Sequence, residues 1–339
     1  MTILITGGAG FIGSALVAEA TAHGHEVLVL DALTYAGHPQ NLEGIEGNVT
    51  LMEGDICNAE LLADIYANHA ISAVIHAAAE SHVDNSIAGS AAFISTNITG
   101  THTLLEATRN HYSALDEAAQ KHFRFLHIST DEVYGALGDT GSFTQQSPML
   151  PNSPYAASKA ASDHLVRAWG QTYGLPVLTT RCCNNYGPRQ HPEKLIPLMI
   201  TRALEGEALP VYGSGKQVRE WIHVEDHARA VFTVLESAPL HSITHIGSDE
   251  EVQNIDVVTR ICDVLAEKHG VQAHDNIAHV TDRLGHDFRY ALNREENATL
   301  LPQTRDFVTG LADTIAWYLA NQSWIATMLA HKRSWSAAE

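Results

Sequence analysis

The chain has 339 residues, of which 45% are hydrophobic and 17% charged, values typical of a globular protein with a sizeable core. Its 39 acidic residues outnumber 20 basic ones, for a formal net charge of −19, so we expect no nucleic-acid partner, because so negative a surface repels a phosphate backbone. Any anionic ligand must then be met by locally placed arginines, lysines or helix N-termini.

The start of the chain and its cysteines bear on its location. Met1 leads directly into the apolar run "TILIT", and no apolar run approaches the ~18 residues of a membrane span, so we expect neither a signal peptide nor a membrane partner. Cys57, Cys182, Cys183 and Cys262 lack the spacing of a metal site and indicate free thiols in a reducing compartment. These features predict a cytoplasmic protein.

In chain order, short apolar runs alternate with helical stretches over the first half. Strands are predicted at 2–6, 26–31, 49–53, 73–77, 124–129 and 176–181, and helices near 11–23, 59–68, 90–110 and 155–173. Strands separated by helices predict a parallel sheet covered by helices on both faces. The expected fold class is therefore α/β.

The pattern changes after "NNYGPR", where Pro and Gly become more frequent and the alternation less regular. This change predicts a nucleotide-binding domain over 1–184 and a smaller, mainly substrate-binding α/β domain over 185–330. Residues 219–238 are predicted to be helical and 243–247 to form a strand, so about 219–247 are expected to rejoin the first domain. The last forty residues indicate only an amphipathic helix.

A glycine-rich turn follows the first predicted strand. Gly8, Gly10 and Gly13 match G-x-G-x-x-G, and Gly7 also completes G-x-x-G-x-x-G. Such glycines permit a tight turn and let a pyrophosphate approach the helix N-terminus. The second strand ends in Asp31, about 20 residues further on, where a ribose-binding carboxylate is expected. Together these features predict a dinucleotide site on a Rossmann-type, doubly wound parallel sheet.

Asp31 favours NAD over NADP, because a carboxylate accepts hydrogen bonds from a ribose 2′-hydroxyl and repels a 2′-phosphate. The next residue, Ala32, brings no compensating charge. In "GDI", Asp55 and Ile56 end the third predicted strand and are placed to flank the adenine. Asp55 is equally well placed to cap the next helix, and the sequence alone leaves both alternatives open.

The stretch "YAASK" begins a predicted helix, so Tyr155 and Lys159 lie one turn apart on one face. An ammonium near a phenol favours the phenolate and lowers its pKa, which makes Tyr155 a candidate base. Because Tyr-x-x-x-Lys occurs in many helices without function, the prediction of a catalytic pair depends on the dinucleotide motif that accompanies it.

This combination resembles the extended short-chain dehydrogenase/reductase superfamily, which places Ser or Thr at the end of the strand before that helix, where Thr130 lies. Its 4-epimerases need only Thr or Ser, Tyr and Lys, whereas Thr130, Asp131 and Glu132 resemble the signature of nucleotide-sugar 4,6-dehydratases. Over about residues 1–300 the chain is similar to the dTDP-glucose 4,6-dehydratase family in these motifs: "TGGAGFIGS", "DALTYAG", "HAAAESHVD", "TNITGT", "HISTDEVYG", "SPYAASKA", "NNYGP", "PEKLIP", "LPVYGSGKQVREWIHVEDHARA", "QNIDVV" and "DRLGHDFRYAL".

The resemblance implies an NAD-dependent conversion of dTDP-glucose to dTDP-4-keto-6-deoxy-glucose and water. Thr130 would hydrogen-bond O4, and Tyr155 would take the proton of the C4 hydroxyl while hydride passes from C4 to NAD. Glu132 would then remove the C5 proton, and Asp131, as a neutral acid, would protonate the departing C6 hydroxyl before hydride returns to C6. Adjacent carboxylates suit this division, because like charges in a closed site raise one pKa.

The resemblance also implies which residues contact the ligands. For the cofactor these are Gly7, Gly10, Phe11, Ile12, Gly13, Asp31, Thr34, Gly37, Asp55, Ile56, Ala77, Ala79, Thr96, Tyr155, Lys159 and Asn185. For the substrate they are Ser81, Thr130, Asn184, Lys194, Leu195, Pro210, Tyr212, Arg219, Asn254, Arg283 and His286. Taken singly, the arginines would be surface ion-pair partners and Pro210 or Tyr212 packing residues.

The chain departs from the family pattern at two positions, with Ala32 where Lys is common and Asn85 where Arg is common. Ala32 puts in doubt one contact near the adenosine ribose, and Asn85 puts in doubt one local ion pair. His82, beside Ser81, is expected to be a structural histidine rather than a third catalytic group. With 21 histidines but no H-E-x-x-H or clustered spacing, no metal site is expected.

Other functions remain open at this stage. The alternatives are a 4,6-dehydratase of a UDP-, CDP- or GDP-linked hexose, a nucleotide-sugar 4-epimerase or decarboxylase, and a redox-sensing regulator that binds NAD(H) without turnover. The resemblance further implies a homodimer through helices near 90–110 and 155–173, although core packing explains their apolar pattern equally well.

Overall fold

The computed structural model describes residues 1–336 and is built around a seven-stranded parallel sheet with the order β10-β6-β5-β4-β1-β2-β3. Its strands are β1 (Thr2–Thr6), β2 (Glu26–Asp31), β3 (Val49–Glu53), β4 (Ile71–His76), β5 (Arg124–Thr130), β6 (Val177–Cys182) and β10 (Ile243–Ile246). The prediction of an α/β, doubly wound sheet is confirmed. The order reverses between β1 and β4, which leaves a crevice at the carboxyl ends of these strands.

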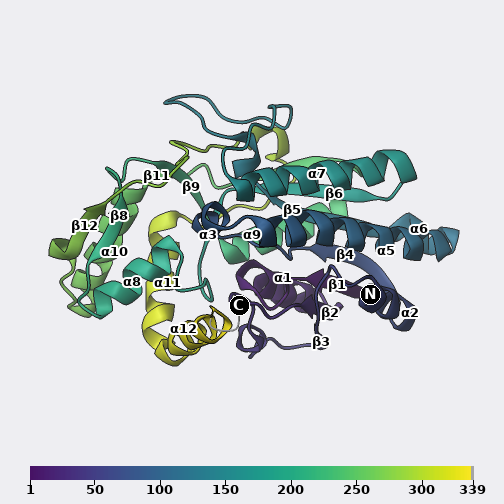
Figure 1. Ribbon diagram of the computed structural model, residues 1–339, viewed down its shortest axis with the longest axis horizontal. Helices are drawn as coiled ribbons and strands as arrows, with labels where there is room; N and C mark the ends of the chain where they lie inside the picture. The colour runs from purple at the N-terminus through teal and green to yellow at the C-terminus, as the bar shows by residue number, and fades with distance from the viewer. Residues whose placement is uncertain (337–339) are drawn as a thin grey trace.

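Successive residues of the strands face two different helical layers. Ile3 and Ile5 lie in one buried cluster with residues of α1 (Phe11–Ala22) and α9 (Val224–Ser237). Leu4, between them, lies in a second cluster with residues of the opposite layer. The helices of that layer are α2 (Ala59–Asn68), α5 (Thr101–Ala114) and α7 (Pro154–Tyr173), and Figure 1 shows α5 and α7 side by side. Burial on both faces explains why the strands are apolar almost throughout.

Helix α7, which carries the predicted catalytic pair, has clear start and stop residues. Ser153 accepts a hydrogen bond from the backbone N–H of Ala156 at 3.1 Å, and Pro154 occupies the first helical position. The helix ends at Gly174, whose φ of +69° is left-handed and favours glycine. These signals determine where α7 begins and ends, and the hydrogen bond from Lys159 to the Ile128 carbonyl places its first turns beside β5.

After β6 the chain forms a second lobe, seen at one end of the molecule in Figure 1. Its strands form two small sheets, with the orders β11 (Glu251–Gln253)–β9 (Val218–His223)–β7 (Asn184–Tyr186) and β12 (Ile277–Val280)–β8 (Leu209–Tyr212). Its helices are α8 (Leu195–Leu204), α10 (Asn254–His269), α11 (Phe307–Ala320) and α12 (Gln322–Ser336), and the lobe has a buried cluster of its own. We propose that it is the substrate-binding domain expected from about residue 185.

Three details differ from the prediction. Residues 219–223 are not helical but belong to β9, because almost every side chain of "REWIH" is buried between neighbouring elements, and the helical period begins only at Val224. The helix expected near 90–110 contains a π-helical stretch at Ile94–Gly100 between α4 (Ala91–Phe93) and α5. The C-terminal region holds two helices, α11 and α12, rather than one.

Shorter elements complete the chain. They are α3 (Val83–Ala88), α6 (Glu117–His122) and the 3-10 turns at Pro39–Leu42, Asp131–Tyr134, His274–Asn276 and Glu295–Asn297. Within residues 1–336, no helix combines the length and apolar character that crossing a bilayer requires.

Candidate active site

A cavity of about 340 Å³ opens where the order of the main sheet reverses, at the carboxyl ends of β1, β4 and β5. Every residue that the sequence assigned to the cofactor lines it: Gly7, Gly10, Phe11, Ile12, Gly13, Asp31, Thr34, Gly37, Asp55, Ile56, Ala77, Ala79, Thr96, Tyr155, Lys159 and Asn185. Thr130, Asp131 and Glu132 line the same cavity. The structure thus brings the dinucleotide motif and the acid pair into one space.

The glycine-rich turn forms a cradle that side chains would fill. Gly7 has a φ of +72°, and a Cβ on Gly13 would lie 1.9 Å from the Gly7 carbonyl oxygen. Gly10 is the N-cap of α1 and gives it no side-chain cap, and the first turn has no acidic residue. The first backbone N–H groups of α1 are therefore available to an anion in the cavity. This geometry fits the pyrophosphate of a dinucleotide.

Asp31 is held at the tip of β2 in a fixed orientation. Its two carboxylate oxygens accept hydrogen bonds from the backbone N–H groups of Ala9 and Leu33, each at 2.9 Å. Burial raises the pKa of Asp31, and these two N–H groups lower it. A Cβ on Gly37 would lie 2.6 Å from the carboxylate, so Gly37 allows the loop to close over it. Ala32 lines the cavity without adding charge, which fits NAD rather than NADP.

The alternative role of Asp55 as a helix cap is wrong. Asn58 caps α2, because its Oδ1 accepts a hydrogen bond from the N–H of Leu61 at 3.1 Å. Asp55 instead accepts one from the N–H of Cys57 at 2.8 Å and lines the cavity. Together with the glycine cradle and Asp31, this rim fits the adenosine and pyrophosphate portion of NAD.

The acid pair lies where β5 passes into a short 3-10 turn. The Thr130 hydroxyl donates to Asp131 Oδ1 at 3.2 Å and accepts from the backbone N–H of Glu132 at 3.3 Å. Asp131 is only 1% exposed, and its Oδ2 has no hydrogen-bond partner within the described chain. Asp131 therefore has one oxygen free to act on a ligand in the cavity.

Different surroundings separate the two carboxyl groups. Burial, then the charges of Glu132 and Glu220, raise the pKa of Asp131 well above its usual value. Burial also raises the pKa of Glu132, but the positive charges of Arg219 and Arg283 lower it. The protonated form is therefore favoured more strongly at Asp131 than at Glu132. The division of acid and base roles between the two residues stays a prediction.

Tyr155 and Lys159 both line the cavity, but the pKa of Tyr155 is not lowered as expected. The Lys159 ammonium donates to the Ile128 carbonyl at 2.8 Å, and burial lowers its pKa to about 8. Burial and then the charge of Glu132 raise the pKa of Tyr155 well above its usual value. The prediction of a lowered pKa for Tyr155 is wrong for the protein's own groups, because desolvation and the charges of the acid pair raise it. A phenolate there needs a further positive charge.

The expected substrate residues divide into three groups. Ser81, Thr130, Asn184 and Lys194 line the main cavity, whereas Arg219, Arg283 and His286 line a second pocket that meets it at Glu132 and Asn184. Tyr212 lies beside that pocket, with the Arg283 guanidinium 5.3 Å from its ring centre. Leu195, Pro210 and Asn254 line neither space.

The departure at Asn85 leaves a neighbouring ion pair in place. Asp84, the residue before Asn85, forms an ion pair with Arg283, with 2.6 Å between Asp84 Oδ1 and Arg283 Nε. His82 Nδ1 accepts a hydrogen bond from the N–H of Asn85 at 3.4 Å and caps α3, and burial lowers the pKa of His82 to about 4. This places His82 in a structural position rather than in the acid–base cluster.

Sequence reasoning missed several residues that shape the site. Glu80, Cys182, Cys183, Gln190 and His191 also line the main cavity, and Ser153, Asp287 and Tyr290 the second pocket. Asn97, in the π-helical stretch, bonds both the N–H and the carbonyl of Glu80 at 2.9 Å and donates to the Ser158 hydroxyl at 2.8 Å. It thereby ties the loop after β4 to α7, a role that its motif "TNITGT" does not reveal.

Comparisons with known proteins agree with this geometry. A model of the NAD dependent epimerase/dehydratase family matches residues 3–247. The dTDP-glucose 4,6-dehydratase of Xanthomonas campestris pv. campestris is 52% identical over 336 residues, covering 97% of this chain and 96% of that protein.

Two solved structures show how far the fold is shared. The dTDP-glucose 4,6-dehydratase DesIV of Streptomyces venezuelae, with NAD and dTDP bound, has a TM-score of 0.88 and 44% identity, covering 97% of this chain and 100% of that one. The UDP-glucose 4-epimerase of Thermotoga maritima, with UDP-glucose, has a TM-score of 0.85 at 26% identity, covering 95% and 100%. Because an epimerase shares the fold, the site residues must distinguish the reactions.

Proposed function

Because the chain belongs to the NAD dependent epimerase/dehydratase family, we infer its reaction from the residues that separate members of that family. The chain is an NAD-dependent dTDP-glucose 4,6-dehydratase, a hydro-lyase that forms dTDP-4-keto-6-deoxy-glucose and water. The observation that carries this conclusion is the Asp131–Glu132 pair, which lines the same cavity as Tyr155 with its two pKa values set apart. A 4-epimerase has no step that needs such a pair.

The oxidation half of the reaction uses residues on β5 and α7. NAD, when bound, supplies the acceptor for the C4 hydrogen and a positively charged nicotinamide ring. We propose that Tyr155 accepts the proton of the C4 hydroxyl and that Thr130 orients that hydroxyl. Lys159, anchored on the Ile128 carbonyl, lies one helical turn from Tyr155 and adds positive charge to the site.

The elimination half uses the acid pair. A ketone at C4 acidifies the C5 proton, and we propose that Glu132 removes it. Arg219, Arg283 and Lys194 favour the ionised form of Glu132, which is the form a base requires. Asp131, whose protonated form is favoured by burial and by its acidic neighbours, then donates its proton to the departing C6 oxygen, which leaves as water. The positive charges thus oppose the effect of burial on the pKa of Glu132, whereas the acidic neighbours of Asp131 add to the effect of burial on its pKa.

The diphosphate of the substrate needs local positive charge in a chain whose formal net charge is −19. Arg219 is 7% exposed and held by its bond to the Asp287 carbonyl at 2.9 Å, with its guanidinium 4.4 Å from the Tyr290 ring centre. We propose that Arg219, Arg283 and Lys194 meet the nucleoside diphosphate. Asn184, His286 and Tyr212 would contact the same ligand.

We also propose that the protein is a homodimer through the outer face of α5 and α7, which pack against each other. Ile94, in the π-helical stretch before α5, and Tyr173, at the end of α7, each leave 48% of their surface exposed. Sedimentation velocity should show a dimer for the wild type and a monomer for Ile94→Glu. A monomeric wild type at micromolar concentration would contradict the proposal. The free thiols of Cys57, Cys182, Cys183 and Cys262 further support a location in the cytoplasm.

The activity is tested by incubating the protein and NAD with dTDP-glucose and, in parallel, with the UDP-, CDP- and GDP-linked sugars. Mass spectrometry should show loss of one water from dTDP-glucose, at a higher rate than from the other three. An isomer of unchanged mass would indicate an epimerase instead. Faster loss of water from another nucleotide would overturn the dTDP assignment while leaving the dehydratase assignment in place.

A further inference from the structure

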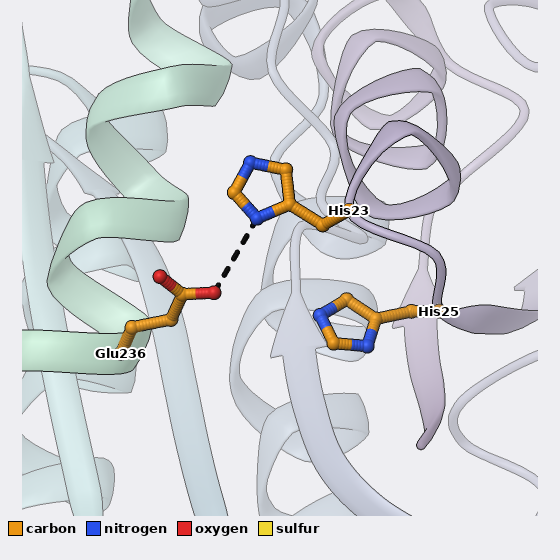
Figure 2. Close-up of side chains that lie close together, drawn as sticks. All are labelled: His23, His25 and Glu236. Atoms are coloured by element: carbon orange, nitrogen blue, oxygen red, sulfur yellow. Dashed lines mark hydrogen bonds and ion pairs between the residues drawn. The ribbon is translucent and has the colours of Figure 1, made fainter.

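Two histidines and a glutamate meet on the surface between the α1–β2 connection and the end of α9. His23 follows the last residue of α1, His25 precedes β2, and Glu236 lies in the last turn of α9. Each residue offers one candidate ligand atom, and these three atoms lie within 4.8 Å of one another. Figure 2 shows the His23 ring facing the Glu236 carboxylate, with the His25 ring beside them. These residues lie at the amino end of β2, opposite the carboxyl ends that form the active site.

The distances are close to those of a metal centre. His23 Nδ1 lies 3.4 Å from Glu236 Oε1. Two ligands on a tetrahedral zinc ion, each about 2.0–2.1 Å from it, lie about 3.3–3.5 Å apart. His23 and Glu236 therefore have the required separation already. His25 must approach by about 1–1.5 Å at most, and a partly exposed side chain at the start of a strand can do so by rotation.

A further carboxylate orients His23. Its other ring nitrogen, Nε2, lies 3.2 Å from Oε1 of Glu19, one helical turn earlier on α1. A histidine that binds a metal through one nitrogen and donates its other N–H to a carboxylate is a recurring arrangement in metal sites. The Phe232 ring lies 5.4 Å from the His23 ring and 6.3 Å from the His25 ring, so both imidazoles lie beside the same aromatic side chain.

The competing explanation is that His23 is simply a charged group bridging Glu19 and Glu236. That arrangement does not involve His25, and exposed ion pairs of this kind contribute little to the stability of the fold. The position of His25, with a ring nitrogen within 4.8 Å of ligand atoms of the other two, therefore favours the metal site.

We propose that His23, His25 and Glu236 bind one divalent transition-metal ion of the zinc type, with Glu19 as the positioning residue of His23 and water completing the coordination. Two imidazoles and a carboxylate suit such ions, whereas Mg²⁺ prefers oxygen ligands alone. The ion would join the α1–β2 connection to α9, and α9 itself packs against α1. It would therefore stabilise the packing of this layer on the sheet and take no part in the sugar chemistry.

Calorimetric titration of the metal-free full chain with Zn²⁺ tests the proposal. We expect one equivalent to bind with a rise in Tm, and Mg²⁺ at the same concentration to do neither. His25→Asn should abolish this binding, and Glu19→Gln should weaken it by about 10–100-fold, the usual effect of losing such an orienting carboxylate. Dehydratase turnover should not change on treatment with EDTA, so this result is independent of the proposed function.

A matched control is His274→Asn, because His274 is exposed and lies 2.8 Å from a single carboxylate, that of Asp263. It should leave the Zn²⁺ affinity unchanged. If His25→Asn binds Zn²⁺ as tightly as the wild type, or if His274→Asn loses as much affinity as His25→Asn, the proposed site is overturned. In the first case the cluster is an ion-pair bridge, and in the second the chain binds zinc through scattered histidines.

Discussion

Glu132→Gln should stop the reaction between oxidation and elimination. Glutamine keeps the shape of the side chain and much of its hydrogen bonding, but it cannot accept the C5 proton. Thr130, Tyr155 and Lys159, which serve the first half of the reaction, are unchanged. We therefore expect oxidation at C4 to continue and the loss of water to become the slow step.

The surroundings of Glu132 determine the size of the effect. Burial raises the pKa of Glu132, and the charges of Arg219 and Arg283 oppose this by favouring the carboxylate, the form in which Glu132 acts as a base. Loss of a general base slows the step it serves by about 10²–10⁴-fold, which corresponds to about 3–5 kcal/mol of barrier. The same positive charges remain in the variant, so we expect binding of the anionic substrate to be retained.

The assay mixes the variant and NAD with dTDP-glucose and follows two signals. The absorbance of the reduced nicotinamide should rise and persist, while the 4-keto-6-deoxy product forms slowly. In deuterated water, incorporation of deuterium at C5 should slow together with product formation.

The matched control is Asp131→Asn, which removes the neighbouring acid and leaves the base. Exchange at C5 should continue in that variant, while departure of the C6 oxygen becomes slow. If Glu132→Gln releases product at the wild-type rate, the acid pair does not perform the elimination. If both variants lose exchange equally, the separate roles assigned from their pKa values are wrong.

Three other predictions follow from particular residues. Tyr155→Phe should lower kcat by several orders of magnitude and abolish C4 oxidation itself, and near-normal single-turnover kinetics would remove Tyr155 as the base. Asp31, with uncharged Ala32 beside it, predicts tighter binding of NAD than of NADP in calorimetry, and equal affinities would refute the role of that carboxylate. Burial lowers the pKa of His227 to about 4, so the stability linked to this group is complete above its unfolded pKa of about 6.5 and is lost as pH falls toward 4. When the pH falls from about 7.5 to about 5, the wild type should therefore lose about 2 kcal/mol more stability than His227→Leu. Denaturant midpoints that fall by the same amount in both proteins over this pH range would contradict this.

The features that the sequence predicted correctly depend on local pattern. The main strands follow from apolar runs between helical periods, and Gly7 to Gly13 mark a turn whose backbone admits no side chain. Asp31 lies at the tip of its strand because strand length and the following turn determine where the carboxylate emerges. Such features need no knowledge of distant residues.

The features that it missed depend on contacts between distant segments. The pKa of Asp131 is raised in part by Glu220, which comes from the second lobe, and no local spacing reveals that neighbour. The strand at 218–223 is specified by burial between β7 and β11, which outweighs its resemblance to a helix. The His23–His25–Glu236 cluster likewise joins segments from opposite parts of the chain, so a search for metal-binding spacing could not find it.

The measurement that tests the central assignment most directly uses dTDP-glucose labelled with deuterium at C4. A 4,6-dehydratase moves that hydrogen to C6 within one molecule, so in ordinary water the product should be lighter by one water and carry the deuterium at C6. Deuterium at C4 of a product that has lost no water would identify an epimerase. Loss of the label to solvent during dehydration would contradict transfer within the closed site.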